Sequence, residues 1–166
     1  ITRVDDNLHA RFDAVEREYT YVITTRKSPF LRGFAWFYNG VLDIDKMNEA
    51  LHRLLDYEDF TSFAKLNSNN TTNICHIFAA ECYRCEQDDT IRIRIRANRF
   101  LRNMVRAIVG TVVDVGRGRY SVEEFCHIIE ARDLSLSSSG APAQGLYLTD
   151  VKYNKFSRTI LKTLTY

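Results

Sequence analysis

Isoleucine and arginine alternate strictly over residues 91–96, within the segment 90–97, and no other feature restricts the fold of the chain as strongly. In an extended strand, successive side chains point to opposite faces. The isoleucines at 91, 93 and 95 therefore share one face, and the three arginines between and after them share the other. The alternation predicts a strand with one apolar face and one strongly basic face.

Cap residues and periodicity predict the remaining elements. Asp43 is a plausible N-cap, and Ser121 with Glu124 three residues later forms a capping box, so a helix is expected to follow each. Gly116 is expected to end another helix in a left-handed conformation. We predict strands at 17–26, 74–85, 90–97 and 146–153, an extended run at 31–38, and helices at 44–55, 100–115 and 121–132.

This order of elements predicts a single α+β domain in which helices lie on one face of a mainly antiparallel sheet. With 166 residues, the chain is long enough to bury a core without disulfides or metal. No run of about 18 apolar residues occurs, so no membrane span is expected, and the first residues show no targeting pattern. The four cysteines are typical of reduced, intracellular residues, and we expect a cytoplasmic protein.

Positive charge is concentrated in one stretch. Residues 92–119 hold eight arginines and one acid, a net charge of +7, whereas the whole chain carries +2. Arginine suits bidentate phosphate contacts and stacking on bases, so sheet and helix are expected to present one concave basic surface to a polyanion. The alternative is a solvated surface with counter-charges folded against it. The residues expected to contact an RNA backbone are Arg92, Arg94, Arg96, Asn98, Arg99 and Arg102.

Cysteine and histidine spacing gives a weaker signal. Cys75-His76 followed by Cys82-x-x-Cys85 looks like a zinc knuckle. However, Cys82 and Cys85 would point to opposite faces of one predicted strand, and no second Cys/His pair stands at a suitable distance. The four histidines are scattered, without a spacing typical of nucleophilic catalysis. We expect no metal site.

Six co-linear sequence blocks, covering about residues 9–153, closely resemble the C-terminal half of one known family. This is the tRNA pseudouridine synthase A (TruA) family. The blocks are H-A-R-F-D-A from residue 9, R-E-Y-T-Y from 17, D-F-T-S-F from 59, R-A-N-R-F from 96, M-V-R-x-I-V-G from 104, and A-P-A-x-G-L-Y-L from 141.

The resemblance implies an isomerase that converts uridine to pseudouridine at tRNA positions 38 to 40, in the anticodon stem-loop. It further implies a homodimer that needs no cofactor, in which a nucleophilic Asp breaks the N-glycosidic bond of a flipped uridine. Carried over to this chain, Tyr19 contacts the uracil and assists proton removal from C5, Arg106 pairs with the nucleophilic carboxylate, and Leu146 packs against the base. Without the resemblance, Tyr19 is interpreted as an ordinary strand tyrosine, Arg106 as a solvated helix charge and Leu146 as a core residue.

The family's R-T-D-x-G-V-H block, which carries the nucleophile, is absent from this sequence. Arg3, Asp5 and His9 share its offsets, but His9 already belongs to the H-A-R-F block, so we expect Asp5 to be a linker residue. Residues 1–16 are then expected to link to a missing N-terminal half, 17–153 to form the C-terminal domain, and 154–166 to form a tail. This interpretation predicts a chain that is inactive alone. The alternative is a non-catalytic RNA-binding or dimerisation module with the same fold.

Overall fold

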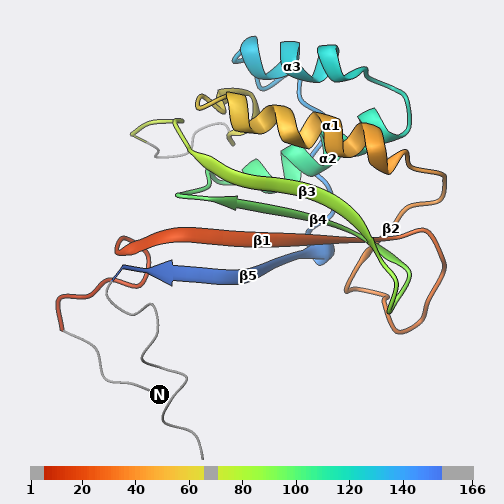
Figure 1. Ribbon diagram of the computed structural model, residues 1–166, viewed down its shortest axis with the longest axis horizontal. Helices are drawn as coiled ribbons and strands as arrows, with labels where there is room; N and C mark the ends of the chain where they lie inside the picture. Colours follow the sequence, from red (N-terminus) through yellow and green to blue (C-terminus); the bar gives the residue numbers. More distant parts are fainter. Residues whose placement is uncertain (1–5, 66–70, 155–166) are drawn as a thin grey trace, which may run out of the picture.

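Figure 1 shows the computed structural model, which describes residues 6–65 and 71–154. Within these ranges, β1 (Ala14–Thr24) runs through the middle of a five-stranded sheet. It pairs antiparallel with β4 (Thr90–Ala97) on one side and β5 (Leu146–Tyr153) on the other. An antiparallel partner, β3 (Ile77–Cys85), continues the sheet beyond β4, and β2 (Trp36–Phe37) forms a short parallel pair at the end of β1. The predicted mainly antiparallel sheet is confirmed.

The helices gather on one face of this sheet (Figure 1). They are α1 (Ile44–Arg53), α2 (Met104–Gly116) and α3 (Val122–Glu130), with 3-10 turns at Leu54–Asp56, Thr61–Phe63 and Ala143–Gly145. Both predicted N-caps are present, because Asp43 accepts the Lys46 amide at 3.0 Å and the Ser121–Glu124 capping box closes in both directions. The α+β class predicted from the sequence is therefore confirmed.

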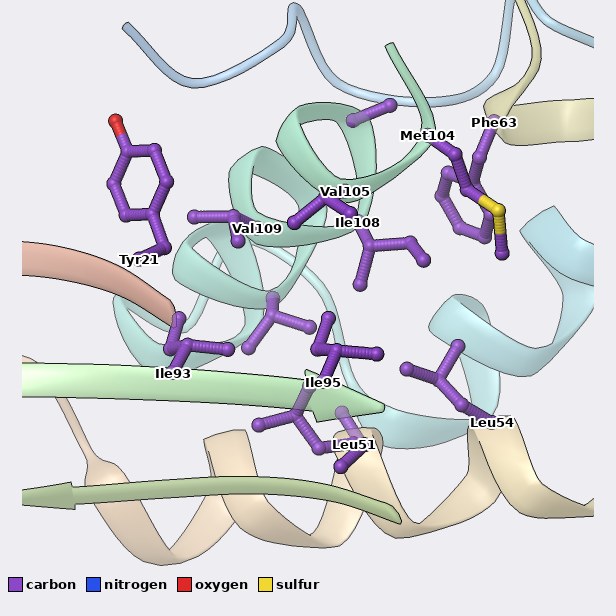
Figure 2. Packing of buried hydrophobic residues seen from close by; sticks show 14 of the residues in the cluster. Tyr21, Leu51, Leu54, Phe63, Ile93, Ile95, Met104, Val105, Ile108 and Val109 are labelled. Atoms are coloured by element: carbon purple, nitrogen blue, oxygen red, sulfur yellow. The ribbon is translucent and has the colours of Figure 1, made fainter. Parts of the chain in front are cut away.

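The isoleucine face of β4 is buried under α2. Ile91, Ile93 and Ile95 are each at most 1% exposed. Figure 2 shows Ile93 and Ile95 in the same packed cluster as Ile108 and Val109 of α2. Because the arginines of β4 alternate with these isoleucines, they lie on the opposite, helix-free face of the sheet.

The predicted bounds of the second helix were wrong at both ends. Helix α2 begins at Met104 rather than at residue 100, because Asn103 takes a left-handed conformation with φ 69°. Gly116 is still helical, and the left-handed residue after the helix is Gly118, with φ 76°. Gly116 matters for packing instead: a Cβ there would lie 2.6 Å from the Met47 sulfur.

The extended run predicted for residues 31–38 was wrong for most of its length. Only Trp36 and Phe37 form a strand. The chain before them turns tightly: the amides of Phe34 and Ala35 both donate to the Leu31 carbonyl at 3.0 Å, and Gly33 has φ 82°. Residues 34–38 are all apolar or aromatic, and such a run without a clear period does not distinguish a turn from a strand.

Strand β1 begins at Ala14, inside the segment 1–16 that the sequence predicts as a linker. Asp5 and residues 155–166 of the predicted tail lie outside the described residues. In the described part of the chain, no helix combines the length and apolar character needed to cross a membrane.

Candidate functional site

Tyr19 lies near the middle of β1, on the face that the helices cover. Its half-buried ring meets the Phe100 ring edge-on, with 5.1 Å between the centroids and an 89° angle between the planes. Leu148 of β5 stands directly opposite Tyr19 in the ladder, and its side chain is 54% exposed. Since directly paired residues share a face, Tyr19 and Leu148 form an apolar ledge at the edge of the helix layer.

Arg106 lies in the first turn of α2 and is fixed to the segment before β5. Its Nε donates to the Ala141 carbonyl at 2.5 Å, and the Ala141 amide donates to the Arg106 carbonyl at 2.9 Å. Gly110 and Gly140 let this segment approach, because a Cβ on Gly110 would lie 2.5 Å from the Ser139 carbonyl and one on Gly140 3.3 Å from the Asn103 side chain. The guanidinium is therefore held in one orientation.

The charge of Arg106 has no counter-ion in the described residues. Each ion pair found there joins other residues, and no described carboxylate lies within 4.0 Å of the Arg106 guanidinium. Its side chain is nevertheless half-buried. A fixed, partly desolvated cation of this kind attracts a carboxylate or a phosphate.

Tyr21, two residues after Tyr19 on the same face, is fully buried. Its hydroxyl donates to the Pro142 carbonyl at 2.6 Å. Burial raises the pKa of Tyr21 far above its usual range, and the nearby positive charge of Arg106 opposes that shift only in part. Tyr21 therefore stays neutral and anchors the segment that also holds Arg106.

Leu146 begins β5 and is half-buried, in direct register with Tyr21. The preceding residue has to be small: a Cβ on Gly145 would lie 2.8 Å from both the Tyr21 ring and the Val22 carbonyl. This close approach turns the chain from the Pro142 segment into β5. Leu146 then lies two residues from Leu148, on the same face.

Tyr21 connects the three site residues that the sequence predicts. Tyr19 precedes it on the same strand face, the Arg106 charge acts on its hydroxyl, and Leu146 pairs with it across the ladder. Sequence reasoning did not identify Tyr21 or Leu148 as members of the site. The period-two spacing of R-E-Y-T-Y and of G-L-Y-L places each of them beside a predicted residue and was the available signal.

The predicted single basic surface was wrong, because the sheet separates its members. On the helix-free face, the arginines of β4 each meet a carboxylate: Arg92 pairs with Asp88 at 2.7 Å and Arg96 with Glu16 at 3.6 Å. Arg94 pairs with Glu81. Arg106 lies on the helix side. The β4 arginines match the alternative of a solvated face with folded counter-charges, and their contact with RNA stays a prediction.

The other predicted RNA-contacting residues lie in the connection between β4 and α2. Arg99 and Arg102 precede the helix, so they form no helical stripe with Arg106. Neither has a carboxylate within 4.0 Å among the residues that the structure places. Asn98 has a structural role, because its Oδ1 accepts the His76 amide at 2.8 Å and its carbonyl accepts from Arg17 at 2.7 Å.

The cysteines do not form a metal centre in the described residues, where no group of three or more His, Cys, Asp or Glu could hold an ion. Cys75, Cys82 and Cys85 are buried and free. Burial raises the pKa of Cys75 to about 11 and that of Cys82 to about 12, so both are neutral thiols.

Comparison with known proteins gives consistent matches. Residues 50–154 match the family model described as tRNA pseudouridine synthase. The chain is 46% identical, over 99% of its length, to a tRNA pseudouridine synthase A of Bacteroides thetaiotaomicron, and 48% identical over 92% to one of Bacteroides fragilis. It is also 41% identical, over 92% of its length, to one of Listeria monocytogenes. The chain spans 64%, 60% and 62% of the length of these relatives, respectively.

Proposed function

Because the chain belongs to the tRNA pseudouridine synthase family, we propose that the protein isomerises uridine to pseudouridine in tRNA, at positions 38 to 40 of the anticodon stem-loop. The observation that carries this proposal is the state of Arg106. It is half-buried, fixed by Ala141 and without a carboxylate partner in the described residues, and its charge acts on Tyr21, which shares a strand face with Tyr19. The arrangement suits a flat base that is attacked by a carboxylate from another segment.

The nucleophile belongs to the R-T-D-x-G-V-H block, and this sequence contains no such block. We place it in the part of the relatives' length that the chain does not span. Pairing with Arg106 would hold the pKa of that carboxyl low, so the nucleophile would be ionised and oriented. The chain then contributes Tyr19, Arg106 and Leu146, and we expect it to form no pseudouridine by itself.

The reaction is an isomerisation, so its atoms balance within the uridine. The bond between C1′ and N1 breaks, the base turns, and a bond forms between C1′ and C5. The C5 proton leaves, and N1 gains a proton. Tyr19 is the chain's candidate for contact with the uracil and for removal of the C5 proton. Leu146 packs against the base, and neutral Tyr21 pairs with Leu146 in the ladder and anchors the segment before it.

The substrate and assembly follow from the same proposal. A tRNA would approach the ledge from the edge at which Leu148 is exposed. Arg99 and Arg102, which have no described carboxylate partner, are the best placed of the predicted RNA contacts. We further propose that the enzyme works as a homodimer in the cytoplasm and needs no cofactor.

The test uses the natural full-length protein and an unmodified tRNA transcript with tritium at uridine C5. Tritium release reports the departure of the C5 proton, and mapping of the product shows whether it lies at positions 38 to 40. Arg106→Ala should slow release by roughly a hundredfold to a thousandfold, because it removes a fixed charge from the reacting carboxylate. Arg53→Ala, an exposed arginine on α1, is the matched control. Release by Arg106→Ala at the control's rate would overturn the proposal.

A further inference from the structure

The turn between β1 and β2 encloses a hollow that the proposed reaction does not use. It has a volume of about 440 Å³, and its lining includes Thr24 at the end of β1 and Phe37 of β2. Figure 1 shows where these two strands meet. Its apolar lining includes Pro29, Leu31, Ala35 and Trp36. This is the segment that the sequence predicts as an extended run, and the tight turn at Gly33 creates the hollow.

The charged residues that line this hollow are all positive. Arg26, Lys27 and Arg32 line it, and no acidic residue does. Arg26 is neutralised by Asp89 at 2.9 Å. In the described chain, Lys27 and Arg32 have no carboxylate within 4.0 Å, so two cations remain available for a ligand. The site is therefore complementary to an anion.

Exposed aromatic side chains occur in the lining of the hollow and in the turn next to it. Phe37 lines the hollow and is 39% exposed, while Phe30 and Phe34 of the turn are 88% and 61% exposed. Solvent-exposed aromatic rings next to cations are the combination that binds single-stranded nucleic acid, by stacking on bases and by contact with phosphates. A small anion alone would leave these rings without a partner.

The hollow adjoins the candidate site. Trp36 meets the Tyr21 ring edge-on, with 6.3 Å between the centroids. Gln144, on the wall of the hollow, belongs to the turn that follows the Tyr21 acceptor Pro142. Along β1, Thr24 at the hollow is five residues from Tyr19, roughly 16 Å in a strand. A few nucleotides of RNA span such a distance.

We propose that this hollow binds one nucleotide of the substrate RNA, a few positions from the uridine that reacts at Tyr19. Lys27 and Arg32 hold its phosphate, and its base stacks on the exposed ring of Phe37. This inference rests on the proposed function and adds a second anchoring point to it. Two anchoring points on one strand fix the position of the target uridine over the ledge.

The experiment compares two double variants of the natural full-length protein that lose the same charge. Lys27→Ala with Arg32→Ala removes the two available cations of the hollow, and Lys46→Ala with Arg53→Ala removes two from α1. For the hollow variant we expect the Kd for an unmodified anticodon stem-loop RNA to rise about tenfold or more, and the salt dependence of binding to weaken by about two phosphate contacts. At saturating RNA, its kcat should equal that of the α1 variant.

A second pair tests the base contact. Phe37→Ala should weaken RNA binding about fivefold or more through lost stacking, whereas Val41→Ala, which truncates a side chain that is 90% exposed, should not. Equal RNA affinity of the two double variants, in a protein that forms pseudouridine, would overturn the inference and leave the proposed function standing. An altered oligomeric state with unchanged RNA affinity would show a protein occupant instead and would also overturn it. A natural protein that forms no pseudouridine would overturn both.

Discussion

Arg106 and Ala141 hold each other through two hydrogen bonds of opposite direction. The guanidinium Nε donates to the Ala141 carbonyl at 2.5 Å, and the Ala141 amide donates to the Arg106 carbonyl at 2.9 Å. One bond orients the side chain and the other attaches the loop to α2. Any change that lifts the loop from the helix therefore also misplaces the charge on which the proposed chemistry depends.

Gly110→Ala should lift this loop. The new Cβ would lie 2.5 Å from the Ser139 carbonyl, a backbone atom that cannot move alone. Helix propensity alone would make Gly110→Ala stabilising by up to about 1 kcal/mol. A net loss of stability would therefore show that the clash outweighs the gain in helix propensity. We expect the free energy of unfolding to fall by about 1–3 kcal/mol and kcat to fall more than tenfold. Urea unfolding and tritium release measure the two effects.

Gly116→Ala is the matched control, because it adds the same Cβ to the same helix. Its nearest neighbour is the Met47 sulfur at 2.6 Å, which belongs to a flexible side chain, so we expect a smaller loss of stability. The loop at Ala141 is not touched, and kcat should stay near the wild-type value. Equal losses of kcat in the two variants would show that the Gly110 contact does not act through the loop.

Tyr21→Phe and Tyr19→Phe should separate support from chemistry. Removal of the Tyr21 hydroxyl leaves the Pro142 carbonyl without its donor, and we expect the free energy of unfolding to fall by about 1–2 kcal/mol. The Tyr19 hydroxyl has no hydrogen-bond partner in the described residues, so Tyr19→Phe should leave stability unchanged while it lowers kcat. Thermal unfolding together with single-turnover kinetics tests this, and a stability loss in Tyr19→Phe would contradict the assignment.

Asp88 should link stability to pH. Hydrogen bonds from Thr90 are the main cause that lowers its pKa to about 2, and Arg92 adds to them at 2.7 Å, although partial burial opposes the shift. A lowered pKa stabilises the fold above the usual carboxyl range, and this contribution is lost as the pH falls towards 2.

Asp88→Asn should therefore cost about 1 kcal/mol at pH 7, a modest value because the side chain is 36% exposed and solvent screens it. The difference from wild type should shrink between pH 4 and pH 2. Glu86→Gln, in the same hairpin and without a partner in the described residues, should show no such trend. A gap that stays constant with pH in urea unfolding would rule out this linkage.

Elements that depend on local sequence patterns could be predicted, whereas a boundary set by one residue's backbone conformation was missed. Both ends of the strand at 90–97 could be predicted, because alternation is a local property of the sequence. Only one face of this strand is apolar, so only that face can be buried in the core. The caps at Asp43 and Ser121 are local for the same reason. The start of α2 was missed, because the spacing of apolar residues does not show that Asn103 takes a left-handed conformation.

The candidate site could be predicted only as a set of residue names. The family resemblance pointed to Tyr19, Arg106 and Leu146, but periodicity could not show that Tyr21 connects them, since that requires the register of β1 with β5 and the path of the loop around residue 141. The side of the sheet on which each arginine lies depends in the same way on non-local packing. The concentration of arginine in residues 92–119 suggested one basic surface, whereas the structure has two faces.

The final prediction concerns these two faces. Arg99→Ala with Arg102→Ala removes cations that have no carboxylate partner in the described residues, so RNA binding should weaken and its salt dependence should fall by about two phosphate contacts. Arg92→Ala with Arg94→Ala removes cations already paired with Asp88 and Glu81, and a smaller change is expected. Filter binding of tRNA over a range of salt concentrations measures both. A larger effect from the β4 pair would place the RNA on the helix-free face of the sheet, opposite Tyr19 and Arg106.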